Sequence, residues 1–338
     1  MNRCFYSIVF FVLISLASAQ YKIKYFELDY TSKKVDNSLY TSIKFLDSRE
    51  DTSNMGIVRV GTLNKEAFVN ANGSFSTQIS NLLSKINGSV TAQQNELLFQ
   101  LRRLKFVEKA EEGKEFGYCF FRANLFANNG SNYNMISSID TFIVVEAKDV
   151  TKPIIEEANK IIANFLIEGL TKKVNEVSSL TMNEILKIDS IEKLKIKVYN
   201  VSAYTNGVYK TFMSFKAQIP DYTLFSITFE DGEITEVKAK NRKGKVSKVK
   251  SANVYAIVNN GKPFISAKYG YYPIVKNNND FYFIGDDKLH FIKGQIIKTN
   301  SIFNSSEYVY NPLPITSVFE IKIDHVNGKF MRVREMKN

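Results

Sequence analysis

The chain has 338 residues and a formal net charge of +11, with 45 Lys and Arg residues against 34 Asp and Glu residues. Its two cysteines exclude a disulfide framework. The 26 Phe and 18 Tyr residues favour strands, and a chain of this length can bury the cores of about two domains.

Residues 1–19 have the features of a secretory signal segment. Arg3 supplies a positive charge, residues 5–16 are nearly all apolar, and residues 17–19 give the small-residue pattern of a cleavage site. The apolar run is shorter than the ~20 residues that a spanning helix needs, so we expect cleavage between Ala19 and Gln20. The mature protein is expected to be exported, to the periplasm or out of the cell, without a transmembrane segment.

Residues 20–171 are predicted to form an α+β domain with an antiparallel sheet and two main helices. Apolar residues at helical spacing begin at Phe75 and after a Thr151 N-cap, which indicates a helix at each place. Cys119 lies in an apolar run typical of a strand and is expected to be a buried thiol. The predicted strands are residues 21–30, 39–46, 57–63, 96–107, 116–126 and 135–147, the last three as an antiparallel meander.

Residues 172–193 are more polar and are interpreted as a connecting segment with one short helix capped by Thr181. Residues 194–338 are predicted to form a β-rich domain of short antiparallel strands, because apolar runs alternate there with Asn, Gly and Asp turns. The predicted strands are residues 194–198, 222–229, 233–239, 254–258, 263–272, 281–284 and 291–298. The fold class predicted for the whole chain is α+β.

The stretch NGVYKTFMSFKAQIPD, residues 206–221, combines a turn signal with helical spacing. Four apolar residues follow at intervals of four, three and four, which places them on one face of a helix. A cap at Thr211 and a stop at Pro220 predict a helix over residues 211–218. The four residues are Val208, Phe212, Phe215 and Ile219. Alternatively, the aromatic residues of the stretch line a ligand groove; these are Tyr209, Phe212 and Phe215.

The same stretch resembles the motif Gly-Ile/Val-Tyr-x-Thr/Ser-Phe-x-x-Phe-x-x-x-x-Pro, found in secreted proteins of unknown function from Bacteroidota. Here the motif runs over residues 207–220, and the segments that follow it in those proteins are matched by residues 254–261, 272–275 and 281–285. The acidic residue that usually follows Phe212 is absent. This resemblance covers residues 204–330. The first half of the chain is similar to envelope auxiliary lipoproteins in element order alone, and neither resemblance supplies catalytic residues.

The densest run of positive charge surrounds a predicted turn at residues 241–244. The sequence predicts an exposed hairpin whose strands carry outward basic side chains. These are Lys238, Lys240, Arg242, Lys243, Lys245 and Lys248. Either the hairpin is a solvated edge on which lysines oppose aggregation, or it contacts anionic lipid head groups or acidic glycan. No nucleic-acid partner is expected, because no recognition motif is present and the export signal argues against an intracellular target.

The chain has two histidines, His290 and His325. Asp286, Asp287 and His290 could place three metal ligands on one turn, but their spacing matches no strong zinc pattern. Asp324 and His325 are adjacent on a predicted strand, which would point their side chains to opposite faces. We therefore expect no metal site and no cofactor.

The sequence carries no Gly-x-Ser-x-Gly, His-Glu-x-x-His or phosphate-binding loop motif. It therefore favours an exported, non-enzymatic binding or accessory protein of the cell envelope, with an envelope protein, an anionic lipid or an acidic glycan as partner. One alternative is a secreted hydrolase that acts on polysaccharide or peptide through two carboxylates, which leave no local pattern. Another is a structural subunit of a surface assembly, which would expose a large apolar patch.

Overall fold

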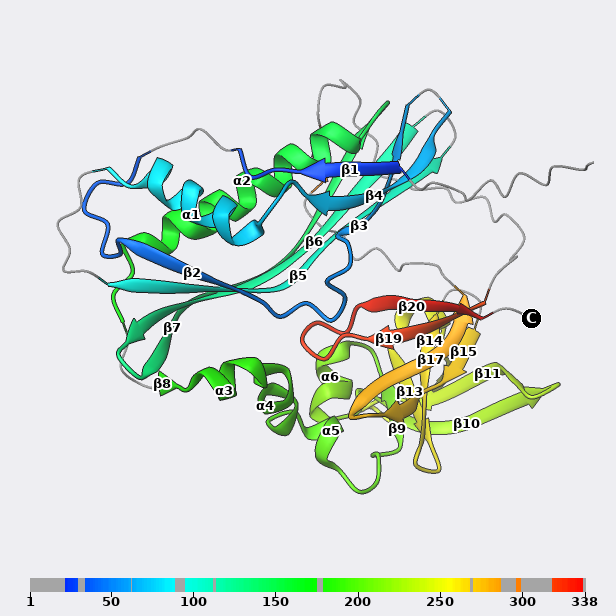
Figure 1. Cartoon of the computed structure of the whole chain (residues 1–338). Helices are drawn as coiled ribbons and strands as arrows, with labels where there is room; N and C mark the ends of the chain where they lie inside the picture. Colours follow the sequence, from blue (N-terminus) through cyan, green and yellow to red (C-terminus); the bar gives the residue numbers. More distant parts are fainter. Residues whose placement is uncertain are drawn as a thin grey trace, which may run out of the picture. The chain divides into compact units, whose positions relative to one another are not determined.

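The computed structural model describes residues 22–29, 34–61, 63–88, 95–111, 114–174, 179–267, 270–286, 296–298 and 318–336 (Figure 1). The chain divides into two units. Unit 1 holds the described residues up to Leu180 together with residues 296–298, and unit 2 holds the others. The predicted signal segment, with Ala19 and Gln20, lies outside the described residues. Within the described ranges, no helix is both long and apolar enough to cross a membrane.

Unit 1 is built on a nine-stranded sheet in the order β1-β4-β3-β5-β6-β7-β18, with β2 beside β5 and β8 beside β7. Its centre is the predicted antiparallel meander, formed by three strands of 16 residues each, β5 to β7. The strands are β1 (Lys22–Phe26), β2 (Ser42–Asp47), β3 (Gly56–Val60), β4 (Lys65–Ala71), β5 (Glu96–Glu111), β6 (Lys114–Asn129), β7 (Asn132–Ala147), β8 (Ser179–Leu180) and β18 (Ile296–Lys298).

Two amphipathic helices, α1 (Phe75–Ile86) and α2 (Thr151–Leu170), bury their apolar sides in the main core of unit 1 (Figure 1). Successive side chains of a strand point to opposite faces, so Cys119 and Phe121 join this core while Tyr118 and Phe120 lie in a separate cluster. Burial raises the pKa of the Cys119 thiol. Cys119 is therefore a buried core residue, as predicted, rather than a reactive thiolate.

The prediction of a purely antiparallel sheet is wrong in the outer part of unit 1. Strand β1 runs parallel to β4, and both β2 and β3 run parallel to β5. Parallel neighbours are joined by long connections rather than by tight turns. The alternation of buried and exposed side chains along a strand does not indicate which distant strand pairs with it. These parallel pairings could therefore not be predicted from the sequence.

The start of α2 also differs from the prediction. Val150 is the N-cap, and Thr151 is the first helical residue. The Thr151 hydroxyl donates to the Arg59 carbonyl oxygen at 2.7 Å, and it lies 2.9 Å from Oε2 of Glu108. The same Glu108 oxygen accepts the N–H of Arg59 at 3.0 Å. Thr151 therefore connects α2 to β3 and β5 instead of capping its own helix.

Glu108 gives unit 1 a testable pH dependence. Burial raises the pKa of this carboxyl group, hydrogen bonds from Arg59 and Thr151 oppose the rise, and the carboxylates of Glu115 and Asp149 add to it. The folded protein then holds this proton more tightly than the unfolded chain. Glu108 thus lowers the free energy of unfolding as the pH rises above the ordinary carboxyl pKa of about 4.3.

We expect Glu108→Gln to remove this contribution, because the amide oxygen still accepts the same hydrogen bonds but carries no charge. Urea unfolding from about pH 4 to pH 8 measures it. The variant should lose less stability than the parent between about pH 4 and pH 6. A steeper decline in the variant over that interval would contradict the assignment.

Unit 2 is β-rich, and the strand pairings within it are antiparallel. Its sheets have the orders β10-β11-β12, β15-β14-β13-β9 and β16-β17-β19-β20. The strands are β9 (Gly207–Tyr209), β10 (Thr223–Glu230), β11 (Glu233–Lys240), β12 (Val246–Lys248), β13 (Ala256–Asn259), β14 (Lys262–Ala267), β15 (Gly270–Pro273), β16 (Val275–Asn277), β17 (Asp280–Asp286), β19 (Val318–Ile323) and β20 (Phe330–Met336). The described chain is therefore α+β with a β-rich second unit, as predicted.

Unit 2 begins with three short helices, α3 (Met182–Leu186), α4 (Ile188–Leu194) and α5 (Lys197–Asn200). A further helix, α6 (Phe212–Ala217), follows β9, and the 3₁₀ helix η1 (Ser251–Asn253) follows β12. The division between the units falls after Leu180, within the predicted connection 172–193. Thr181 caps α3 as predicted, in a capping box with Glu184.

Two predictions for the second half of the chain are wrong. Residues 194–198 do not form a strand: they lie at the end of α4 and the start of α5. The amide of Asn200 donates to the carbonyl oxygens of Lys193, Leu194 and Ile196 at 2.8, 3.0 and 2.8 Å, which holds these residues in a helical arrangement. In addition, β18 pairs with β7 of unit 1, so residues 194–338 do not all belong to the second unit.

The stretch 206–221 forms strand β9 followed by α6. Thr211 caps α6 in a capping box with Ser214, as predicted. The helix ends at Gln218, whose φ of 55° is left-handed. The predicted helical face is wrong at both ends, because Val208 is buried by pairing with β13 and Ile219 is exposed.

Candidate functional site

The hairpin of β11 and β12 carries the predicted run of basic residues, and it forms as predicted. The two strands pair with Lys238 opposite Lys248. Asn241 closes the turn, because its side-chain oxygen accepts the N–H groups of Lys243 and Lys245, both at 3.0 Å. The exposed basic residues of the turn and its flanks are Lys240, Arg242, Lys243 and Lys245.

Glu236 forms ion pairs with two of the predicted lysines. Its carboxylate lies 2.9 Å from Nζ of Lys238 and 3.3 Å from Nζ of Lys248. Hydrogen bonds from these two ammonium groups lower the pKa of Glu236. The carboxylate therefore relieves the repulsion between like charges that the strand register places opposite each other.

A groove with a volume of about 640 Å³ lies beside this hairpin, and we call it the lysine groove. Three lysines line it: Lys210 after β9, Lys248 at the end of β12, and Lys250 just before η1. The other lining residues are Tyr222, Ala239, Asn241, Ser247, Val249, Ala252 and Asn253. Among these described lining residues there is no carboxylate and no histidine.

Lys210 is held in place from two sides. Its ammonium lies over the ring of Tyr222, 5.7 Å from the centroid, and its backbone N–H donates to the Asp221 carboxylate at 2.8 Å. The backbone N–H of Val208 donates to the Tyr222 carbonyl oxygen at 2.9 Å, which holds the backbone of Tyr222 beside β9. The groove therefore presents ammonium groups beside amide and hydroxyl groups, a set of donors that suits an anion.

The structure brings only part of the predicted basic run to this groove. Lys248 lines it, whereas Lys238, Lys240, Arg242, Lys243 and Lys245 are not among its described lining residues. The sequence did not single out Lys210 or Tyr222 as part of this site. Lys210 lies within the stretch 206–221 and Tyr222 directly follows it. No local sequence pattern predicts that these residues line the same groove as the residues of η1.

The predicted aromatic groove does not form. Tyr209, Phe212 and Phe215 are all buried. The rings of Tyr209 and Phe215 meet edge to face with centroids 5.4 Å apart, and Phe212 contacts Tyr255 at 5.5 Å. Tyr209 and Phe215 belong to a buried core cluster of unit 2, and Phe212 is buried against Tyr255, so these three side chains leave no aromatic groove.

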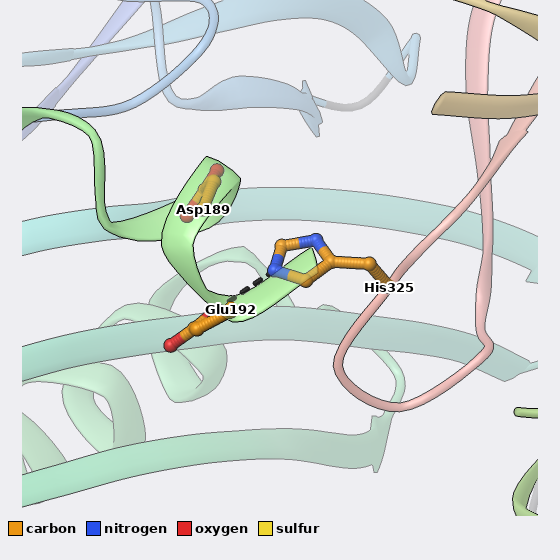
Figure 2. A group of neighbouring side chains, drawn as sticks. All are labelled: Asp189, Glu192 and His325. Carbon is orange, nitrogen blue, oxygen red and sulfur yellow. Dashed lines mark hydrogen bonds and ion pairs between the residues drawn. The ribbon is translucent and has the colours of Figure 1, made fainter. Parts of the chain in front are cut away.

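A second cluster of polar side chains lies elsewhere in unit 2. Asp189 and Glu192 project from α4, and His325 projects toward them from the connection between β19 and β20 (Figure 2). His325 Nε2 lies 2.8 Å from Glu192 Oε2, and ligand atoms of all three side chains lie within 4.8 Å of one another. His325 is buried, Glu192 is half-buried and Asp189 is exposed.

The sequence analysis made two statements about the histidines: a possible metal-ligand set that includes His290, and a strand that carries His325. Asp287 and His290 lie outside the described residues, and the side chain of Asp286 is not described. The placement of Asp324 and His325 on a strand is wrong, because β19 ends at Ile323. Both residues are buried in the turn that follows it, where Asp324 organises the backbone.

Comparisons with protein-family models and with curated proteins find no match. Among solved structures, the chain is similar to the crystal structure of protein XCC0632 from Xanthomonas campestris, described as family-model DUF330. The similarity covers 43% of this chain and 89% of that chain, at 10% identity and a TM-score of 0.27. A likeness this limited transfers neither a fold nor a function. The resemblance to secreted Bacteroidota proteins stays a prediction.

Proposed function

We propose that this protein is an exported, non-enzymatic binding protein and that its second unit binds an anionic ligand in the lysine groove. The observation that carries the proposal is the convergence of Lys210, Lys248 and Lys250 on one groove whose described lining is without acidic residues. The ligand class is a carboxylate- or phosphate-bearing molecule of the envelope, either an acidic glycan or an anionic lipid head group.

The dimensions and donors of the groove support this proposal. Its volume of about 640 Å³ falls within the range of small-molecule sites, roughly 300–1,000 Å³. Lys210 and Lys250 each contribute a positive charge, the ammonium of Lys248 is shared with Glu236, and neutral polar groups come from Asn241, Ser247 and Asn253.

The hydrolase alternative has less support in the two cavities described here. The lysine groove has no carboxylate among its described lining residues. A second cavity, of about 380 Å³ in unit 1, contains Asp47, which is paired with Arg49 at 2.7 Å. Paired-carboxylate hydrolysis needs two facing carboxyl groups, and neither lining provides two. The hydrolase and surface-subunit alternatives stay predictions.

The test is binding of two anionic probes to the full-length chain: a soluble polyuronate, and vesicles that contain an anionic phospholipid. The groove variant reverses two charges, Lys210→Glu with Lys250→Glu. The control makes the same charge change on the hairpin turn, Lys243→Glu with Lys245→Glu. Each lysine near an anionic surface contributes about 1 kcal/mol, so the groove variant should bind about 30-fold more weakly, or worse, at roughly 0.15 M salt.

The control should lose less than about threefold, because its side chains are exposed outside the groove. Binding of the polyuronate alone would identify a glycan ligand, and binding of the vesicles alone a lipid ligand. The proposal is wrong if neither probe binds the parent chain. It is also wrong if the control variant loses as much affinity as the groove variant, because the hairpin charge and not the groove would then govern binding.

A further inference from the structure

The two carboxylates of the second cluster are held on one side of a short helix. Asp189 and Glu192 are three residues apart on α4, a spacing that makes side chains neighbours. Ile188 is buried on this helix, and Lys193 forms a buried ion pair with Asp280 of β17 at 2.6 Å. The position of α4 against the sheet is therefore fixed.

The histidine is held by the turn between β19 and β20. Oδ1 of Asp324 accepts the N–H groups of Val326 and Asn327, at 2.8 and 3.2 Å. Tyr255 donates its hydroxyl to the Gly328 carbonyl oxygen at 2.8 Å, which attaches the turn to the core. His325 is thus presented by a turn with few alternative conformations.

Gly328 is required for this arrangement. Its φ is +73°, and an added Cβ would lie 2.2 Å from Cγ of Phe212. Phe212 of the 206–221 stretch therefore packs directly onto the turn that carries His325. Close packing of this kind places the imidazole before any ligand arrives, which is what a metal site requires of its ligands.

The geometry and charge of the cluster match a metal ion better than a simple ion pair. One imidazole and one carboxylate, here His325 and Glu192, would suffice for an ion pair. Asp189 adds a second carboxylate, with ligand atoms of the three residues within 4.8 Å. Zn²⁺ binds imidazole nitrogen and carboxylate oxygen at roughly 2.0–2.2 Å in tetrahedral sites, so two ligand atoms of one ion lie about 3.5 Å apart. The ligand atoms of the three side chains, now within 4.8 Å of one another, would have to move closer to hold the ion.

We propose that Asp189, Glu192 and His325 form a binding site for a divalent transition-metal ion, with Zn²⁺ as the best match to this donor set. Two carboxylates and one imidazole supply the oxygen and nitrogen donors that Zn²⁺ binds. Imidazole disfavours Mg²⁺ and Ca²⁺, which take oxygen ligands. The site goes beyond the proposed anion binding and differs from the sequence-based expectation of no metal. It was not foreseen because 133 residues separate Glu192 from His325.

The experiment is a Zn²⁺ titration of the full-length chain after chelator treatment and dialysis, against a chromophoric competitor. Co²⁺ serves as a second, spectroscopic probe of an imidazole-containing site. We expect one saturable Zn²⁺ site per chain and a rise in the thermal midpoint on saturation, because the ion binds the folded state. Asp189→Asn and Glu192→Gln should each weaken binding by about tenfold or more, and His325→Asn should abolish the Co²⁺ signal.

His290→Asn is the matched control, because His290 is the other histidine of the chain. It should leave the affinity unchanged. If His325→Asn fails to fold, the two carboxylate variants decide the question. The proposal is overturned if the parent chain shows no saturable Zn²⁺ site, if both carboxylate variants bind as the parent does, or if His290→Asn loses the site.

Discussion

Gly56→Ala is expected to lower the free energy of unfolding by about 3 to 5 kcal/mol, enough to prevent stable folding of unit 1. Gly56 begins β3 with a φ of +100°, which side-chain-bearing residues rarely adopt. An added Cβ would lie 2.0 Å from the carbonyl oxygen and 2.9 Å from the nitrogen of Phe106. These atoms belong to the backbone of β5, and Phe106 is also tied to Met55 by a 2.7 Å hydrogen bond.

Gly61→Ala is the matched control for this prediction. Gly61 also has a positive φ, +75°, but an added Cβ there would meet no atom within 4 Å. It should therefore cost only the conformational strain, about 1 kcal/mol. Urea unfolding of the two variants measures the difference. Equal losses would mean that β3 and β5 are not in the close parallel pairing described for them.

Asp280→Ala is expected to cost about 3 to 5 kcal/mol of unfolding free energy, because it breaks a buried ion-pair network by removing its shared carboxylate. Asp280 lies 2.6 Å from Nζ of Lys193 and 3.0 Å from Nζ of Lys322. The side chains of all three are at most 12% exposed. Loss of Asp280 should also loosen α4, so weaker Zn²⁺ binding is expected in the same variant.

An exposed ion pair provides the control for Asp280. Asp29 lies 3.1 Å from Nζ of Lys85, with side chains 68% and 52% exposed. Asp29→Ala should change the unfolding free energy by less than about 1 kcal/mol. Adding Lys193→Met to Asp280→Ala should restore part of the loss, because it removes a buried charge that was paired with Asp280. No rescue by the double variant, with Asp280→Ala no worse than Asp29→Ala, would mean that the buried network contributes little.

The elements that the sequence predicted well are those whose cause is local. The apolar stripes of α1 and α2, the capping box of Thr211 and the Asn241 turn each depend on residues close together in the chain. Helical spacing and turn chemistry record such interactions directly. The β5–β7 meander was predictable for the same reason, since antiparallel neighbours follow one another in the sequence.

The elements that were missed depend on partners far away in the chain. Strands β2 and β5 pair in parallel across an intervening β3, β4 and α1, and β18 joins β7 from more than a hundred residues downstream. Residues 194–198 have a strand-like composition, but Asn200 and burial of Ile196 and Val198 stabilise helical turns there. Tertiary contacts override local preference in such segments.

The candidate sites show the same division. The charge of the hairpin was visible in sequence, and Lys248 does line the groove. The other side of that groove, Lys210 with Tyr222, comes from a stretch in which the aromatic residues drew attention and the lysine did not. The second cluster joins α4 to a turn more than a hundred residues away, with Glu192 and His325 in contact. Neither combination has a motif, because folding and not spacing creates it.

Chemical footprinting of the lysines tests the central claim, that an anion binds in the lysine groove, most directly. The full-length chain would be acetylated with and without the polyuronate or vesicle probe, and the labelling of each lysine followed by mass spectrometry. We predict that the probe slows labelling of Lys210, Lys248 and Lys250 several-fold and leaves Lys243 and Lys245 nearly unchanged. Protection of Lys243 and Lys245 with the groove lysines still labelled would contradict the account, because binding would then belong to the exposed hairpin turn.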